Sequence, residues 1–95
     1  INMKQQQIIK IIYCIKCKWM LRSTWIAQEL LSTFENDINE IVLSPSDNTG
    51  IFQILLNDEI IWDFKILRKF PQAKEIKQII RDKILPGKNL GHIDN

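Results

Sequence analysis

The sequence contains two cysteines, Cys14 and Cys17, and only two residues separate them. A Cys-x-x-Cys pair can cycle between a dithiol and a disulfide, because one thiolate attacks and the other thiol resolves the mixed disulfide. In a reducing compartment such a pair is more often catalytic or metal-binding than a structural staple. The residue types therefore predict thiol–disulfide chemistry, with two inert thiols as the alternative.

Other kinds of site have little support in the sequence. Structural zinc needs four ligands, usually Cys or His, and the only further candidate is His92 near the end of the chain. Glu29 and Asp63 lack the partner arrangement of a catalytic carboxylate pair, and the sequence has no glycine-rich phosphate loop. We therefore expect no metal and no tightly bound cofactor.

The elements around the pair predict a strand that ends at the first cysteine. Residues 8–13 form a short apolar run rich in β-branched side chains, which is typical of a buried strand. From about Cys17 to Phe34 the apolar residues recur with a helical period, so we expect a helix to begin at the pair. Amides at a helix start stabilise a thiolate, and Lys16 and Lys18 add positive charge. In thioredoxin-type chemistry the first cysteine is the exposed nucleophile, which favours Cys14.

The remaining elements predict the fold class. A second strand is expected over residues 38–44, a turn over 44–50, and a hairpin formed by 51–56 and 60–63. A loop over 66–70 precedes a second helix that starts at Pro71 and is stopped by Pro86 and Gly87. Since a helical crossover makes the first two strands parallel and the hairpin adds antiparallel strands, we expect a four-stranded mixed sheet with two helices. With the cysteine pair after the first strand, this α/β pattern is a reduced thioredoxin-like β-α-β-β-β-α fold.

We expect one domain over residues 8–86, with terminal tails over 1–7 and 87–95. No apolar run approaches the roughly 18 residues of a membrane span, and no secretory signal is visible. These features favour a cytoplasmic protein. Separately, a monomer or a weak homodimer is expected. The formal net charge of +2 argues against nucleic acid as a partner.

The first helix has apolar residues on two sides. Most of them share one stripe, which a sheet should bury: Trp19, Met20, Ile26, Ala27, Leu30, Leu31 and Phe34. Leu21 and Trp25 project from the opposite side and are four residues apart. Either another segment covers them, or they form a surface for a partner or a second copy. On the second helix, Lys77 is expected on the charged outer face.

Basic residues also precede the second helix, at Arg68 and Lys69 beside Phe70. Either they belong to a solvated loop, or they bind the carboxylates of an acidic partner or of a peptide thiol such as glutathione.

Five segments of the chain resemble the bacterial selenoprotein W-related proteins of the selenoprotein T/W/H group. They are Y-C-I-K-C-K-W-M-L-R-S-T-W-I-A-Q-E-L-L-S-T-F (13–34), G-I-F-Q-I (50–54), I-W-D-F-K (61–65), F-P-Q-A-K-E-I-K-Q-I-I-R-D (70–82) and L-G-H-I-D (90–94). The resemblance implies a thioredoxin-like fold and a thiol redox role for Cys14 and Cys17.

Three departures from the expected patterns bear on that role. Selenocysteine-containing members carry selenocysteine at the second position of the pair, where this chain has Cys17; that comparison favours Cys17 as the attacking thiol, against Cys14. The loop that usually carries a Gly-Gly pair has Arg68 and Lys69 here. No proline directly precedes Ile51, so the cis-proline of thioredoxins is not expected.

The function expected from these observations is that of a small cytosolic thiol–disulfide redox protein. Its partner would be a thiol or disulfide protein, or glutathione as a co-substrate. The alternative is a non-enzymatic module of the same fold, whose disulfide state controls a partner surface around Leu21 and Trp25.

Overall fold

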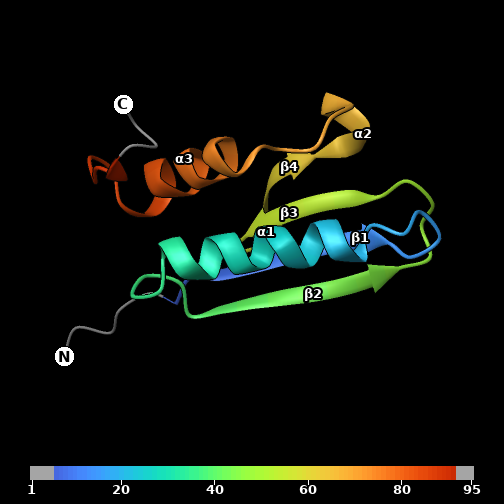
Figure 1. The fold of residues 1–95 in the computed structure, drawn as a ribbon, viewed down its shortest axis with the longest axis horizontal. Coiled ribbons are helices and arrows are strands. Elements are labelled where there is room, and N and C mark those ends of the chain that lie inside the picture. The colour runs from blue at the N-terminus through green and yellow to red at the C-terminus, as the bar shows by residue number, and fades with distance from the viewer. Residues whose placement is uncertain (1–5, 92–95) are drawn as a thin grey trace.

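The computed structural model describes residues 6–91, and it has one sheet with helices packed on it (Figure 1). The elements in chain order are β1 (Ile8–Cys14), α1 (Met20–Thr33), β2 (Glu40–Ser46), β3 (Phe52–Leu56), β4 (Glu59–Asp63), α2 (Phe64–Leu67) and α3 (Ala73–Ile84). This arrangement confirms the α/β fold with a four-stranded mixed sheet. It adds the short helix α2, which partly occupies the segment expected to be a loop.

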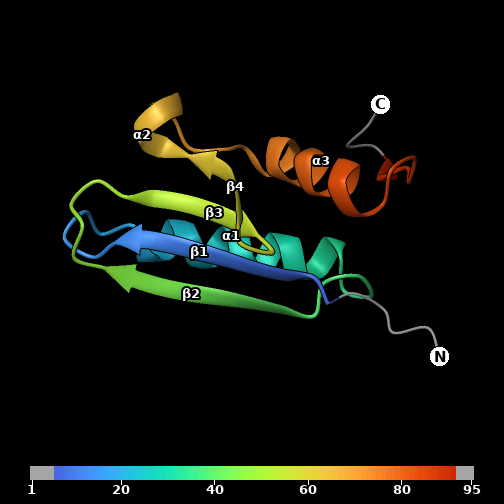
Figure 2. The same ribbon diagram turned by 180° about the vertical axis from the view of Figure 1, so that it is seen from behind.

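The strand order in the sheet is β2-β1-β3-β4. β1 pairs in parallel with β2 and antiparallel with β3, while β3 and β4 form an antiparallel hairpin. Seen from behind, the sheet lies in front of α1 (Figure 2). Because β1 is an inner strand, Cys14 at its end lies between the end of β2 and the start of β3.

The hairpin turn has the backbone geometry that its sequence favours. Asn57 and Asp58 both have positive φ, 49° and 70°, between paired Leu56 and Glu59. Two left-handed residues form the type I′ turn, which matches the twist of the flanking strands. β4 therefore begins at Glu59, one residue earlier than expected.

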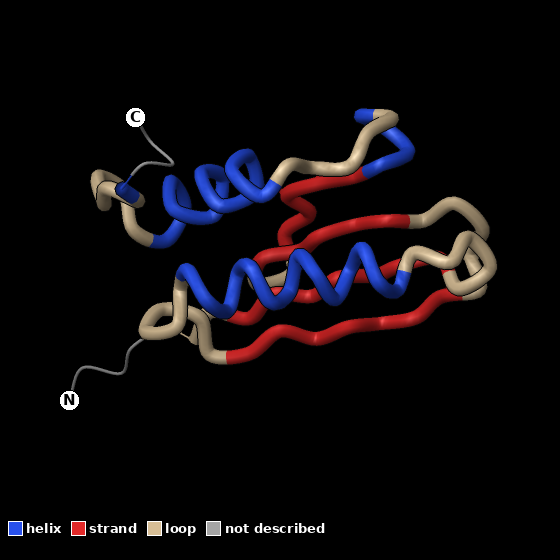
Figure 3. Tube along the Cα trace, in the orientation of Figure 1, coloured by secondary structure: helices blue, strands red, loops and turns tan. Residues whose placement is uncertain are grey.

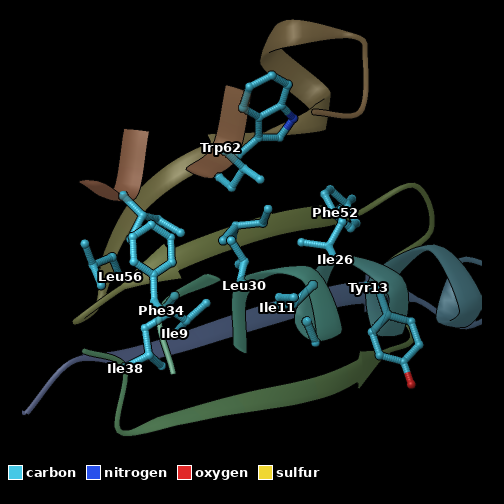
Figure 4. Packing of buried hydrophobic residues seen from close by; sticks show 14 residues of the cluster. Ile9, Ile11, Tyr13, Ile26, Leu30, Phe34, Ile38, Phe52, Leu56 and Trp62 are labelled. Atoms are coloured by element: carbon cyan, nitrogen blue, oxygen red, sulfur yellow. The ribbon is translucent and has the colours of Figure 1, made fainter. Parts of the chain in front are cut away.

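The core lies between α1, α3 and one face of the sheet (Figure 4). Alternate residues of the inner strands are fully buried there: Ile9, Ile11, Phe52 and Ile54. Burying one such side chain contributes about 1.5–3 kcal/mol. Leu30 and Phe34 of α1, and Ile76 and Ile80 of α3, fill the same space from the helical side.

α1 and α3 are also joined by an ion pair. The Lys77 ammonium lies 3.0 Å from a carboxylate oxygen of Glu29 on α1. Lys77 is only 7% exposed, so its prediction as an outer-face residue is wrong. The side of α3 that carries Lys77 faces α1, and the Glu29 carboxylate compensates the buried charge.

Several expected boundaries and burials need correction. α1 begins at Met20 and not at the cysteine pair, and both Met20 and Leu31 are exposed although the helical stripe placed them inside. Trp19 is half-buried against the core. β2 continues through Pro45, which an edge strand tolerates because one side of its backbone needs no partner.

The start of α3 is closed by a capping box rather than by a proline at its first position. Gln72 is the N-cap, its backbone N–H donates to the Glu75 carboxylate at 3.0 Å, and Pro71 lies one residue further out. Lys69 donates to the same carboxylate at 3.2 Å. The Gln72 amide and then the Lys69 ammonium hold the pKa of Glu75 below its ordinary value of 4.5.

Glu75→Ala is expected to lower the free energy of unfolding at pH 7 by about 1 kcal/mol, the usual worth of a helix cap. Because the folded-state pKa of Glu75 is depressed, its charge stabilises the fold above pH 4.5 and this contribution is lost as pH falls through the folded pKa. Urea denaturation at pH 7 and pH 3 tests this, with Lys74→Ala on the same helix turn as the control. An equal loss at both pH values would contradict the role of the charge.

Within residues 6–91, every helix is too short or too polar to reach across a bilayer. Figure 3 shows that most of the described chain lies in strands or helices, and that the longer loops lie at the two ends of the sheet.

Candidate functional site

Cys14 and Cys17 are joined by a disulfide at the end of β1. Their Cα atoms lie 5.3 Å apart, within the usual span of such a bond. The Cys14 N–H donates to the carbonyl of Ile51 at 2.9 Å, and the Ile15 N–H donates to the carbonyl of Ser46 at 3.1 Å. Backbone bonds to both neighbouring segments therefore fix the start of the turn that carries the pair.

The two cysteines differ in burial. Cys14 is 1% exposed, because it ends an inner strand and is enclosed by neighbouring segments, whereas Cys17 is half-buried in the turn. The expectation that Cys14 is the exposed cysteine is therefore wrong. The Cys17 N–H donates to Cys14 Sγ at 3.1 Å, and such an amide donor stabilises negative charge on the buried sulfur.

The cysteines precede the helix instead of starting it. Residues 15–18 form a turn, closed by a bond of 3.0 Å from the Lys18 N–H to the Ile15 carbonyl. Lys18 has φ of +62°, in the left-handed region, and this bend separates the pair from α1. Trp19 is the N-cap of α1, so Cys17 lies outside the helix. Helix amides consequently do not account for the electrostatics at the sulfurs.

An aromatic cluster anchors the segment that follows the pair. The Trp19 ring lies 5.0 Å from the Phe64 ring and 4.9 Å, edge-on, from the Phe70 ring. Phe70 also meets the Phe52 ring of β3 at 5.0 Å. The Arg22 guanidinium lies 4.1 Å above the Phe70 ring, a cation–π arrangement. Phe70, a candidate partner-binding residue, is therefore half-buried in packing that fixes the start of α1.

The Arg68–Lys69 segment adopts a backbone that glycine favours. Arg68 ends α2 with φ of +59°, and its N–H donates to the Phe64 carbonyl at 2.7 Å. A non-glycine residue in this conformation costs about 1–2 kcal/mol. The carbonyl of Lys69 accepts from the Trp62 indole at 3.0 Å. Hydrogen bonds therefore hold this turn in its left-handed conformation, although no glycine is present at these two positions.

A groove of about 410 Å³ adjoins the disulfide turn. Its walls come from the end of β1, the turn, the start of α1 and the edge strand β2, and the lining residues are Tyr13, Ile15, Lys18, Met20, Leu21 and Pro45. Of these, the sequence had pointed to Lys18 and Leu21. For the other lining residues, the one signal in the sequence was Ile15, an apolar residue placed between the two cysteines. Leu21 is 75% exposed, and Trp25, one helical turn later, is 49% exposed.

The Rdx family model matches residues 8–82, which include the disulfide, the groove and the sheet. The chain is a member of the Rdx family. It is similar to the crystal structure of a selenoprotein W-related protein from Vibrio cholerae, with 45% identity and a TM-score of 0.80 over 84% of this chain and 99% of that one. A structure from Bordetella parapertussis has 44% identity and a TM-score of 0.79 over 83% and 99% of the two chains.

The comparisons confirm the resemblance to selenoprotein W-related proteins. No curated protein is significantly similar to the chain.

In this Rdx-family protein only some cations of the described residues form salt bridges, and those of the disulfide turn and of the start of α1 form none. Five basic residues of the described chain form salt bridges: Lys69, Lys77, Arg81, Lys83 and Lys88. Within residues 6–91, no salt bridge involves Lys16, Lys18 or Arg22. The positive charge beside Cys17 is thus not neutralised by the described chain.

The remaining candidate groups lie apart from the sulfurs or outside the described residues. His, Cys, Asp and Glu of the described chain do not gather in threes around a common point that could hold a metal. His92 lies outside the described residues. Glu29 is engaged by Lys77, and Asp63 caps α2 by accepting from the Lys65 N–H at 3.0 Å. Both carboxylates thus have structural partners.

Proposed function

We propose that this protein is a small cytosolic thiol–disulfide redox protein, in which Cys14 and Cys17 cycle between dithiol and disulfide. The observation that carries the proposal is the disulfide between a buried cysteine and a half-buried one, with an amide directed at the sulfur of the buried one. A thiol–disulfide exchanger needs this asymmetry, because one sulfur must meet the substrate while the other resolves the intermediate.

This asymmetry supports a different role for each cysteine. In the oxidising direction a substrate thiolate attacks Cys17 Sγ, the Cys14–Cys17 bond breaks, and Cys14 leaves as a thiolate that the Cys17 N–H stabilises. A second substrate thiolate then attacks the substrate sulfur of the mixed disulfide and releases Cys17. The substrate loses two electrons and becomes a disulfide, and the pair gains two electrons and, with two protons, becomes a dithiol.

The reverse direction uses the same assignment. The Cys17 thiolate attacks a substrate disulfide and expels one thiolate, and Cys14 then attacks Cys17 Sγ and expels the second. A protein disulfide or glutathione disulfide supplies the substrate in this scheme. Lys16 and Lys18 favour the thiolate at Cys17 because both are sequence neighbours of that sulfur and bring positive charge.

The test is exchange with a generic disulfide. The reduced protein is expected to reduce a small aromatic disulfide faster than an equal concentration of free dithiol, and a Cys14→Ser/Cys17→Ser double variant is expected to fall to the rate without protein. Release of the coloured thiol gives the rate, and titration in glutathione mixtures gives the reduction potential. A rate no higher than that of free dithiol would count against the proposal.

The second candidate function is a redox-controlled interaction module without turnover. The exposure of Leu21 and Trp25 on α1 favours it, since large apolar side chains in solvent are typical of partner surfaces. Reversible partner binding that depends on oxidation, together with no turnover above free dithiol, would favour this candidate.

A further inference from the structure

We infer that the groove beside the disulfide binds an extended segment of a protein substrate, in which an apolar side chain and a carboxylate flank the reacting cysteine. The chemistry at Cys17 rests on the proposed function, whereas binding in the groove can be measured without it.

The apolar part of the inference follows from the groove's walls. Five of the lining side chains are apolar: Tyr13, Ile15, Met20, Leu21 and Pro45. Ile15, Met20 and Leu21 are exposed, so water covers them in the free protein. The groove's volume of about 410 Å³ lies within the roughly 300–1,000 Å³ of ordinary ligand pockets. It therefore holds an apolar side chain together with adjoining main chain.

The carboxylate expected in the bound segment is inferred from the charge of the groove. Lys18 lines it, Lys16 lies in the same turn, and no acidic residue is among the lining residues. Neither lysine has a salt bridge with a carboxylate of the described chain. Complementary charge steers partners and fixes their register, so an occupant with a nearby Asp or Glu is favoured over a neutral or basic one.

The position of the groove links recognition to exchange. Lys18 directly follows Cys17, and Ile15 lies between the two cysteines, so the turn that holds the disulfide is itself a wall. One extended residue spans about 3.3–3.6 Å, which places a groove-bound side chain within a few residues of the cysteine that meets Cys17 Sγ. A segment of substrate protein satisfies this better than a small disulfide, which offers no flanking side chain.

Binding is tested with a fluorescein-labelled peptide that carries Glu and Leu beside a Ser in place of the reacting Cys. Oxidised wild-type protein is expected to bind it in anisotropy titrations, and Leu21→Ser and Lys18→Gln are each expected to weaken binding at least about fivefold. The matched controls are Leu31→Ser, an exposed leucine further along α1, and Lys74→Gln, an exposed lysine on α3. Both controls should bind as wild type does.

Two peptide controls separate the two contacts. Replacing the peptide's Glu by Gln should remove the effect of Lys18→Gln, and replacing its Leu by Ser should remove the effect of Leu21→Ser. Equal binding of all peptides, or equal loss in the control variants, would overturn the inference. So would a dimer in solution whose groove is covered by a second copy, as seen by sedimentation and by protection of Leu21 from solvent.

The exchange reaction distinguishes this inference from the proposed function. With the peptide's Cys restored as a mixed disulfide, wild type is expected to react faster than with a small uncharged disulfide, and Leu21→Ser is expected to lose only that preference. Lys18→Gln also removes charge beside Cys17, so its effect is measured by the binding titrations. Exchange without any preference would overturn the inference and leave the redox function standing. Peptide binding without exchange would support the groove and overturn the redox function.

Discussion

Cys14→Ser is expected to accumulate a stable mixed disulfide on Cys17, whereas Cys17→Ser accumulates almost none on Cys14. The half-buried Cys17 meets the substrate, and without Cys14 no thiol of the chain resolves the product. In Cys17→Ser the remaining thiol is that of Cys14, which is 1% exposed at the end of an inner strand. Its reaction must therefore await an opening of the turn.

Intact-mass spectrometry after incubation with glutathione disulfide measures the adduct on each variant. Alkylation with a small iodoacetamide provides the rate, and we expect Cys17 in Cys14→Ser to react at least about ten times faster than Cys14 in Cys17→Ser. The double variant controls for non-specific labelling. An adduct that forms preferentially on Cys14 would show that the turn opens readily and that the first cysteine attacks.

Leu30→Ala is expected to lower the free energy of unfolding by about 3–5 kcal/mol. Leu30 is 0% exposed, in the contact of α1 with the sheet, and its truncation leaves a cavity that the surrounding helix and strands close only partly. A domain of this size has about 5–15 kcal/mol of stability in total, so the variant should lose a large fraction of it.

Leu31→Ala is the matched control, because the same atoms are removed one residue further along the same helix. Leu31 is 44% exposed, and we expect its truncation to cost less than about 1 kcal/mol. Urea denaturation followed by circular dichroism, with the disulfide intact, gives both values. Similar losses in the two variants would show that α1 does not pack as described.

The sequence was sufficient to predict the elements whose patterns are local. β1 is a β-branched run, and the α1 crossover followed by a hairpin leaves few arrangements of a mixed sheet. The exposure of Met20 could not be predicted, since a helical wheel does not show that the first turn of α1 borders a groove instead of the sheet. Lys77 was misplaced because its burial depends on Glu29, forty-eight residues away.

The site was predictable in its residues and not in its geometry. The spacing of Cys14 and Cys17 indicated the bond between them, but the burial of Cys14 arises from segments distant in sequence, among them Ile51, which bonds to it. Likewise, no propensity predicts the left-handed backbone of Arg68. Packing of the neighbouring Phe64 and Phe70 rings and the bond to the Phe64 carbonyl hold it.

The composition of the sheet's two edges bears on how the protein behaves at high concentration. An open edge of unpaired amides is a template for strands of other molecules, and from there for aggregation. Here β2 begins with Glu40 and carries Pro45, which has no N–H to donate. β4, at the opposite edge, is five residues long, and its pairing with β3 is irregular at Ile54 and Leu55. Both edges are thus poor templates for added strands. The protein can therefore expose an apolar groove without aggregating by strand addition at the sheet edges.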